Sequence, residues 1–186
     1  MIIGISGTFS SGKDTLAHHL QEKYGLMHIS TGDIVREIAL AQHGSIERPV
    51  LFDTANQLRH TYGGGVLVDR AVDRYKNSIR TYAGVVITGI RSLAEAKAIK
   101  DQGGTIVFVD APLQQRYDRM QQRQRDGEAR ISIEAFTERE RKELSSGVSD
   151  ADFNITQIGT MADIHLENTG NVDDFFAAAE KALLLA

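Results

Sequence analysis

The sequence predicts an α/β domain built around a parallel sheet, and two observations lead to this class. Five short runs of aliphatic and β-branched residues occur along the chain, and most of them are followed by Gly, Asp or Pro. Continuous apolar runs of this length are typical of strands buried on both faces. Helical segments separate the runs, and such alternation indicates a doubly wound, five-stranded parallel sheet. The expected strands are residues 2–6, 26–29, 84–88, 105–110 and 163–167.

The helical segments between these strands carry apolar residues at helical spacing. Leu16 and Leu20 share one side of the first segment, and Pro112 stands at a natural helix start before another. The expected helices cover residues 14–23, 93–100, 113–125 and 171–185.

Two polar regions interrupt the alternation and contribute no obvious strand. Residues 31–78 are mostly helical, and the glycines at 63–65 suit a turn between two helices; residues 116–147 are rich in Arg, Gln and Glu. Ligands bind at the carboxyl end of such sheets, so we expect a helical insertion and a short lid there. The chain is then a single domain, residues 1–186, with a core of residues 1–30, 79–115 and 148–186.

Composition excludes several function classes. Hydrophobic residues make up 41% of the 186 residues and charged residues 25%, an ordinary globular balance. The net charge of −4 argues against a nucleic-acid or membrane-surface partner, and no apolar run is long enough to span a membrane. The absence of cysteine rules out disulfides and thiol catalysis, and it fits a cytoplasmic protein. We expect a monomer or a homodimer.

The stretch GISGTFSSGKDT, residues 4–15, predicts a phosphate-binding loop. Gly7 allows a sharp turn after the first strand, and Gly12 lets the backbone approach a ligand closely. Backbone N–H groups and the following helix N-terminus would then face phosphate, with the Lys13 amine neutralising its oxygens. The expected nucleotide-binding residues are Gly7, Ser10, Ser11, Gly12, Lys13, Asp14 and Thr15.

Asp14 departs from the usual motif, which has Ser or Thr directly after the lysine. A carboxylate beside phosphates is repelled unless a cation lies between them. Mg²⁺ prefers hard oxygen ligands, so Asp14 implies a metal, bound directly or through water. The carboxylate would also favour the positive N-terminal end of the helix dipole, and the two interpretations are compatible.

Two further stretches resemble nucleotide kinases. The run HISTGDIVRE, residues 28–37, resembles the segment after the second strand of adenylate kinases, and VVITGIRSLAEAK, residues 85–97, resembles their third strand and following helix. Together with later segments, the chain resembles a family of small archaeal and bacterial kinase-like P-loop proteins related to adenylate kinase or dephospho-CoA kinase. This resemblance implies ATP as phosphoryl donor and Mg²⁺ as cofactor.

The resemblance also implies roles for individual residues. Thr31 and Asp33 would border a small phosphorylated acceptor, and Arg36 and Arg91 would bind its phosphate. The implied catalytic residues are Lys13, Arg91, Arg123 and Arg125; Arg119 would contact ATP, and Arg59 would be a further acceptor contact. Arg123, Arg125 and Arg119 fall where lid arginines close over the transferring group in the family.

The chain departs from the adenylate kinase pattern at two places. Thr88 stands at the strand end where that family has a metal-supporting Asp, and Ile90 stands where it has a Phe-Pro pair. We hypothesise that the metal-supporting carboxylate has moved from the strand end to Asp14. The second departure weakens the case for AMP as acceptor.

The acceptor is therefore open among several alternatives. Dephospho-CoA kinases show Asp-x-Asp where this chain has Ser30 and Gly32, which leaves Asp33 alone as a base and favours a nucleoside or deoxynucleoside monophosphate. Dephospho-CoA kinase activity and a regulatory, partner-dependent ATPase are the alternatives.

The remaining charged residues predict little chemistry. Glutamates interleave with arginines late in the lid region, which favours a solvated helix face. This interpretation covers Arg116, Arg130, Arg139 and Arg141 with Glu138, Glu140 and Glu143, and the alternative for Arg139 or Arg141 is a place in the lid. The histidines, His28 among them, show no metal-ligand spacing and are expected to be structural.

Overall fold

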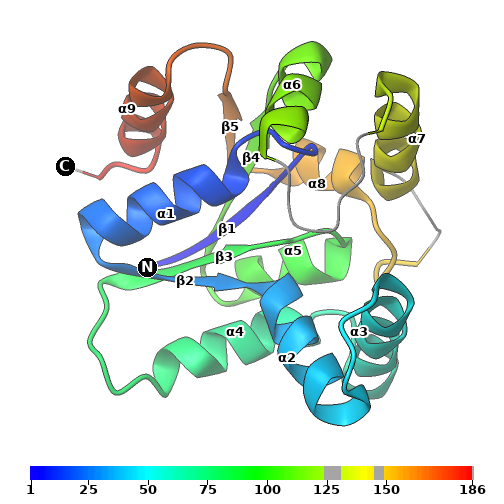
Figure 1. Cartoon of the computed structure of the whole chain (residues 1–186). Coiled ribbons are helices and arrows are strands. Elements are labelled where there is room, and N and C mark those ends of the chain that lie inside the picture. Colours follow the sequence, from blue (N-terminus) through cyan, green and yellow to red (C-terminus); the bar gives the residue numbers. More distant parts are fainter. Residues whose placement is uncertain (124–130, 145–148, 186) are drawn as a thin grey trace.

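The computed structural model describes residues 1–123, 131–144 and 149–185, and its centre is a five-stranded, all-parallel sheet (Figure 1). The strand order is β2-β3-β1-β4-β5, so the first strand lies in the middle. The structure thus confirms the predicted class, and each strand begins and ends within one residue of its apolar run. The strands are β1 (Ile2–Gly7), β2 (Leu26–Ser30), β3 (Gly84–Thr88), β4 (Thr105–Asp110) and β5 (Ile164–Glu167).

The register of the sheet brings the strand ends together at one edge. Thr88 pairs with Ile5 on one side and with Ser30 on the other, while Gly7 pairs with Val109. Because all strands are parallel, the loops that follow β1, β2, β3 and β4 all leave from this carboxyl edge. The edge is therefore where the sequence-predicted functional segments meet.

Helices cover both faces of the sheet (Figure 1). Helix α1 (Lys13–Tyr24) and helix α9 (Val172–Ala182) pack on one face around Leu16, Leu20 and Phe175, which are buried. The other face is covered by α4 (Val66–Lys76), α5 (Leu93–Asp101) and α8 (Ile155–Met161). No helix in the described part of the chain is long and apolar enough to cross a membrane.

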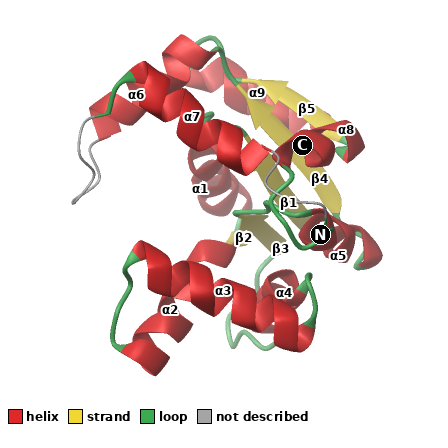
Figure 2. Ribbon diagram, turned by 90° about the vertical axis from the view of Figure 1, so that its right-hand side faces the viewer, coloured by secondary structure: helices red, strands yellow, loops and turns green. Residues whose placement is uncertain are grey.

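The two polar regions are mainly helical over the residues that the structure describes. Residues 31–78 form α2 (Thr31–His43), α3 (Arg48–Tyr62) and α4, and the glycines at 63–65 make the turn between α3 and α4. Figure 2 shows α2, α3 and α4 grouped together, separate from α6 (Leu113–Arg123) and α7 (Ile133–Leu144). The expected lid boundary at residue 116 falls inside α6, because that helix begins directly after Pro112.

Helix α8 was not expected from the sequence. Asn154 caps its N-terminus, since the Asn154 side chain accepts a hydrogen bond of 3.1 Å from the Gln157 backbone. Gly159 lies inside the helix and is disfavoured there by propensity, but a Cβ at this position would lie 3.2 Å from the Phe108 ring. Close packing on β4 therefore favours a glycine at this position, and that glycine hides the helix from sequence analysis.

Candidate functional site

The loop between β1 and α1 has the conformation that its glycines predict. Gly7 has a φ of +140°, and a Cβ there would lie 1.9 Å from the Val109 carbonyl oxygen. Gly12 has a φ of +105° and caps α1, and a Cβ there would lie 2.4 Å from the Asn168 side-chain nitrogen. Ser10 also has a positive φ, 54°. The backbone of this loop is thus fixed in a conformation that ordinary residues avoid.

Lys13 folds back across the loop. Its amine donates to the Thr8 carbonyl oxygen and lies 3.4 Å from the Ser11 hydroxyl. The Ser11 hydroxyl in turn donates to the same carbonyl at 2.9 Å and is fully buried. The lysine therefore sits at the start of α1 with its charge held over the loop, where an anion would meet it.

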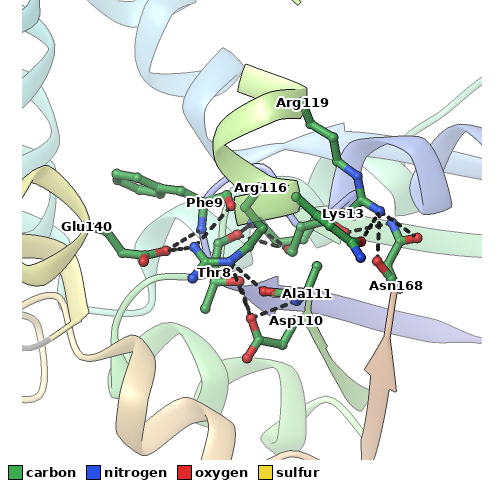
Figure 3. Close-up of polar contacts among 11 residues, drawn as sticks. Thr8, Phe9, Lys13, Asp110, Ala111, Arg116, Arg119, Glu140 and Asn168 are labelled. Atoms are coloured by element: carbon green, nitrogen blue, oxygen red, sulfur yellow. Dashed lines mark hydrogen bonds and ion pairs between the residues drawn. The ribbon is translucent and has the colours of Figure 1, made fainter. Parts of the chain in front are cut away.

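Two polar residues at the ends of the neighbouring strands β4 and β5 form hydrogen bonds with the loop (Figure 3). Asp110, which ends β4, accepts hydrogen bonds from the Thr8 hydroxyl at 2.6 Å and from the Ala111 backbone at 2.8 Å. Asn168, which follows β5, donates to the Ser11 carbonyl at 2.8 Å. Neither residue was singled out from the sequence, although both directly end or follow an apolar run.

Arg119 lies against the same loop through Asn168. The Nη2 of Arg119 donates to the Asn168 carbonyl at 2.7 Å, and its Nη1 is buried without a hydrogen-bond partner among the described residues. Burial removes water from this guanidinium and lowers the pKa of Arg119. Asn168 thus bridges the Arg119 cation to the phosphate loop. A cation at this place could donate hydrogen bonds to oxygen atoms or base nitrogens of a nucleotide bound by the loop.

Asp14 is the second residue of α1 and is half-buried. Thr88, the strand-end residue that the metal hypothesis pairs with it, is buried, and its hydroxyl lies 2.9 Å from His28 Nε2. Burial and the nearby His18 lower the pKa of His28, while the charges of Asp14 and Asp33 act in the opposite direction. His28 therefore lies at the carboxyl edge of the sheet, near the carboxylates of Asp14 and Asp33. The sequence did not suggest this placement, because the histidines show no metal-ligand spacing.

The residues after β2 form the near side of the predicted acceptor site. Thr31 is buried, and its hydroxyl already donates to the Gly89 carbonyl at 3.0 Å. Asp33 and Arg36 form an exposed ion pair on the first turns of α2. Thr31 thus joins the ends of β2 and β3, whereas Asp33 and Arg36 face solvent.

Two of the predicted acceptor arginines converge on one aromatic ring. The guanidinium carbon of Arg91 lies 5.5 Å from the centroid of the Phe153 ring, and that of Arg59 lies 5.7 Å from it. Arg59 also forms a 3.0 Å ion pair with Glu95, which is completely buried. Arg91 is exposed, so these arginines are placed together but only one of them faces solvent.

The remaining predicted residues are Thr15, Arg123 and Arg125. Thr15 is exposed on α1, and Arg123 is the last residue of α6. Arg125 and Arg130 lie outside the described residues.

One expectation for the arginine-rich region is wrong. Arg116 and Glu140 do not belong to a solvated face, because their side chains are 8% and 7% exposed and pair with each other. The Arg116 Nε–H also donates to the Ala111 carbonyl at 2.7 Å. Arg141 does face solvent, where it pairs with Glu138 at 2.9 Å. The local sequence gives the glutamates of this helix similar surroundings, so only tertiary packing distinguishes Glu140.

The sheet order, the glycine-lysine loop and the arginines at the same edge define a domain with the fold of P-loop kinases. Residues 3–143 match the family model AAA_18, described as an AAA domain. The chain is 31% identical to the UPF0200/UPF0201 protein of Archaeoglobus fulgidus, over 98% of this chain and 55% of that one. It is 30% identical to a UPF0200 protein of Thermococcus kodakarensis, over 97% of this chain and 95% of that one. The chain belongs to the UPF0200 family.

Solved structures share the fold at lower identity. A Thermus thermophilus protein, TT1252, superposes with a TM-score of 0.63 at 22% identity, covering 99% of this chain and 96% of that one. The shikimate kinase of Acinetobacter baumannii, solved with shikimate, gives a TM-score of 0.62 at 17% identity, covering 99% of this chain and 91% of that one.

Proposed function

We propose that this chain is an ATP-dependent phosphotransferase whose acceptor is a nucleoside or deoxynucleoside monophosphate. The observation that carries the proposal is one shared edge of the sheet. The loop with Lys13 leaves β1 there, and the segments that bear Arg36 and Arg91 leave the neighbouring strands β2 and β3. A donor phosphate and an anionic acceptor would therefore be bound side by side.

The chemistry of phosphoryl transfer fits such a site. Transfer depends on positioning and charge neutralisation more than on covalent participation by the protein. The loop amides and Lys13 would hold the donor phosphates, while Arg36 and Arg91 would align the acceptor. A phosphate acceptor is already anionic at neutral pH, so it needs no strong base. This favours a monophosphate over an acceptor that reacts through a sugar hydroxyl.

The donor set also fits Mg²⁺. Asp14 supplies a hard carboxylate oxygen on the first turn of α1. Among the described residues, no group of three or more His, Cys, Asp or Glu could hold a metal by itself. Mg²⁺ commonly binds through one or two carboxylates together with waters and substrate phosphates. When bound, it would neutralise charge on the transferring phosphoryl group.

The test is ADP release from ATP and Mg²⁺ with a panel of acceptors. The panel contains AMP, CMP, UMP, GMP, their deoxy forms, dTMP, dephospho-CoA and shikimate, the last because it is bound in the Acinetobacter baumannii neighbour. We expect strong stimulation by one or more monophosphates and loss of that stimulation in K13M. Stimulation by dephospho-CoA or shikimate alone would replace the proposed acceptor. Slow hydrolysis that no acceptor stimulates would instead favour a regulatory ATPase.

A further inference from the structure

Helix α7 contacts both α6 and the phosphate loop through one buried carboxylate, that of Glu140 (Figure 3). Glu140 on α7 accepts a hydrogen bond from the Arg116 guanidinium on α6, and both side chains are more than nine-tenths buried. The exposed side of α7 carries ion pairs in contact with solvent, such as Glu138 with Arg141, whose side chains are 48% and 72% exposed. Glu140 thus joins this helix to the body of the protein.

The residue that Glu140 holds is Phe9, inside the phosphate loop. The Phe9 backbone N–H donates to the same Glu140 oxygen at 3.0 Å, and the Phe9 carbonyl accepts from Arg116 at 3.4 Å. The Phe9 ring packs edge-on against Phe136, with 6.1 Å between centroids. Phe136 lies four residues before Glu140 and therefore on the same side of α7. The amide, the carbonyl and the ring of Phe9 are each held by a different group.

These contacts to Phe9 lie next to Ser10, a loop residue with an unusual backbone conformation. Ser10, the following residue, has a φ of 54°, a conformation that persists where the surroundings impose it. Loop amides bind phosphate well only when they already point toward it, because ordering them on binding would cost affinity.

We propose that Glu140 is a positioning residue that holds the phosphate loop in its nucleotide-binding conformation and so links nucleotide binding to the packing of α7. The proposal deepens the proposed function and rests on its first step, the binding of nucleotide by the loop. Such a link is reciprocal. Loosening α7 weakens nucleotide binding, and nucleotide in the loop tightens the contact with α7.

Titration calorimetry with ADP and Mg²⁺ tests the first half of the link. E140Q keeps the shape of the side chain but removes the charge that Arg116 and the Phe9 amide share. We expect its Kd for ADP to rise about 5- to 10-fold, the loss of roughly one charge-assisted hydrogen bond. E138Q is the matched control on the exposed face of the same helix, and its Kd should stay within about 2-fold of the unaltered protein.

The outcomes separate this inference from the proposed function. A folded E140Q, judged by circular dichroism and melting, that binds ADP as tightly as E138Q would overturn the role of Glu140 alone. Failure of the unaltered protein to bind any nucleotide would overturn the proposed function, and this inference with it.

Hydrogen exchange on the unaltered protein supplies a second measurement that does not depend on the folding of E140Q. The Phe9 amide should be protected from exchange without nucleotide, because Glu140 accepts its hydrogen. Adding ADP and Mg²⁺ should slow exchange in α7 around Phe136 and Glu140. An unprotected Phe9 amide, or exchange in α7 that ADP leaves unchanged, would contradict the link.

Discussion

At the scale of single residues, Asp14 stands where the motif has a hydroxyl, and its carboxylate is the feature of the loop that most needs an explanation. If it supports Mg²⁺, D14S should raise the Mg²⁺ concentration needed for half-maximal ADP release by about 10-fold, since one hard anionic ligand is lost. The measurement is a Mg²⁺ titration at fixed ATP.

The control for this prediction is D33S, which removes an exposed carboxylate from the same edge of the sheet. Its Mg²⁺ requirement should remain that of the unaltered protein. A D14S protein with an unchanged requirement would contradict the metal-supporting role of the Asp14 carboxylate.

His28 should make stability depend on pH. Burial lowers the pKa of His28 below the ordinary value of 6.5, so the unfolded chain binds the proton more readily than the folded one. Stability is then fully present above about pH 6.5 and falls as the pH drops toward the folded value. We expect the melting temperature of H28Q to fall less between about pH 7.5 and pH 5.5 than that of the unaltered protein.

The matched variant for this profile is H43Q, which alters an exposed histidine in the last turn of α2. Its melting temperatures should follow those of the unaltered protein across the same pH range. Parallel profiles for H28Q and the unaltered protein would contradict the prediction.

At the scale of elements, two ion pairs hold the insertion helices in different surroundings. Arg59 on α3 pairs with Glu95 on α5, with side chains 9% and 0% exposed, whereas Arg74 on α4 pairs with Glu37 on α2, with side chains 42% and 59% exposed. R59M leaves a buried carboxylate without its cation, so we expect a loss of about 3–5 kcal/mol of unfolding free energy. R74M should lose about 1 kcal/mol or less.

Denaturant titration of the two variants measures this difference directly. Both substitutions keep an unbranched side chain of similar length, so the loss of the ion pair is the main change in each. Equal losses of unfolding free energy would mean that Glu95, which also accepts hydrogen bonds from the Arg91 and Ser92 backbones, tolerates its burial without Arg59.

The elements show how far sequence periodicity reaches. The strands were predictable because burial on both faces requires an unbroken apolar run. The loop was predictable because the positive φ at Gly7 and Gly12 favours glycine, which the sequence shows directly. Helix α8 was not, because the reason for its glycine is close packing against Phe108, a residue 51 positions earlier in the numbering. The local hydrophobic pattern indicates which side of a segment is buried. It does not indicate which distant residue packs against that side.

The same distinction holds for the site. Residues on the loop itself could be named from spacing, whereas Glu140 and Asn168 reach it from 131 and 157 positions away. Their partners are backbone groups of the loop. Because every residue carries such groups, the sequence does not indicate which of them a distant side chain will bind. The burial of Arg116 is likewise not visible in its own segment, because its ion-pair partner Glu140 lies on α7.

At the scale of the whole molecule, the insertion and the sheet share one apolar core. Val68 on α4 is completely buried in the cluster that also contains Ile87 of β3 and Ile158 of α8. A core that crosses the expected boundaries should unfold in one cooperative step. We predict that V68A lowers the unfolding free energy by about 2–3 kcal/mol without creating a second transition.

The chain has no tryptophan, so single reporters can be placed in each part. Y75W probes the insertion on α4, and Y24W probes α1 on the opposite face of the sheet; both tyrosines are half-buried and pack against the core on their own face. In denaturant, the two reporters should give the same midpoint, and V68A should shift both by the same amount. If V68A shifts the Y75W transition and leaves that of Y24W in place, the insertion unfolds by itself. The acceptor side of the site could then open while the phosphate loop stays folded, because the loop and Y24W belong to the part of the sheet that V68A leaves intact.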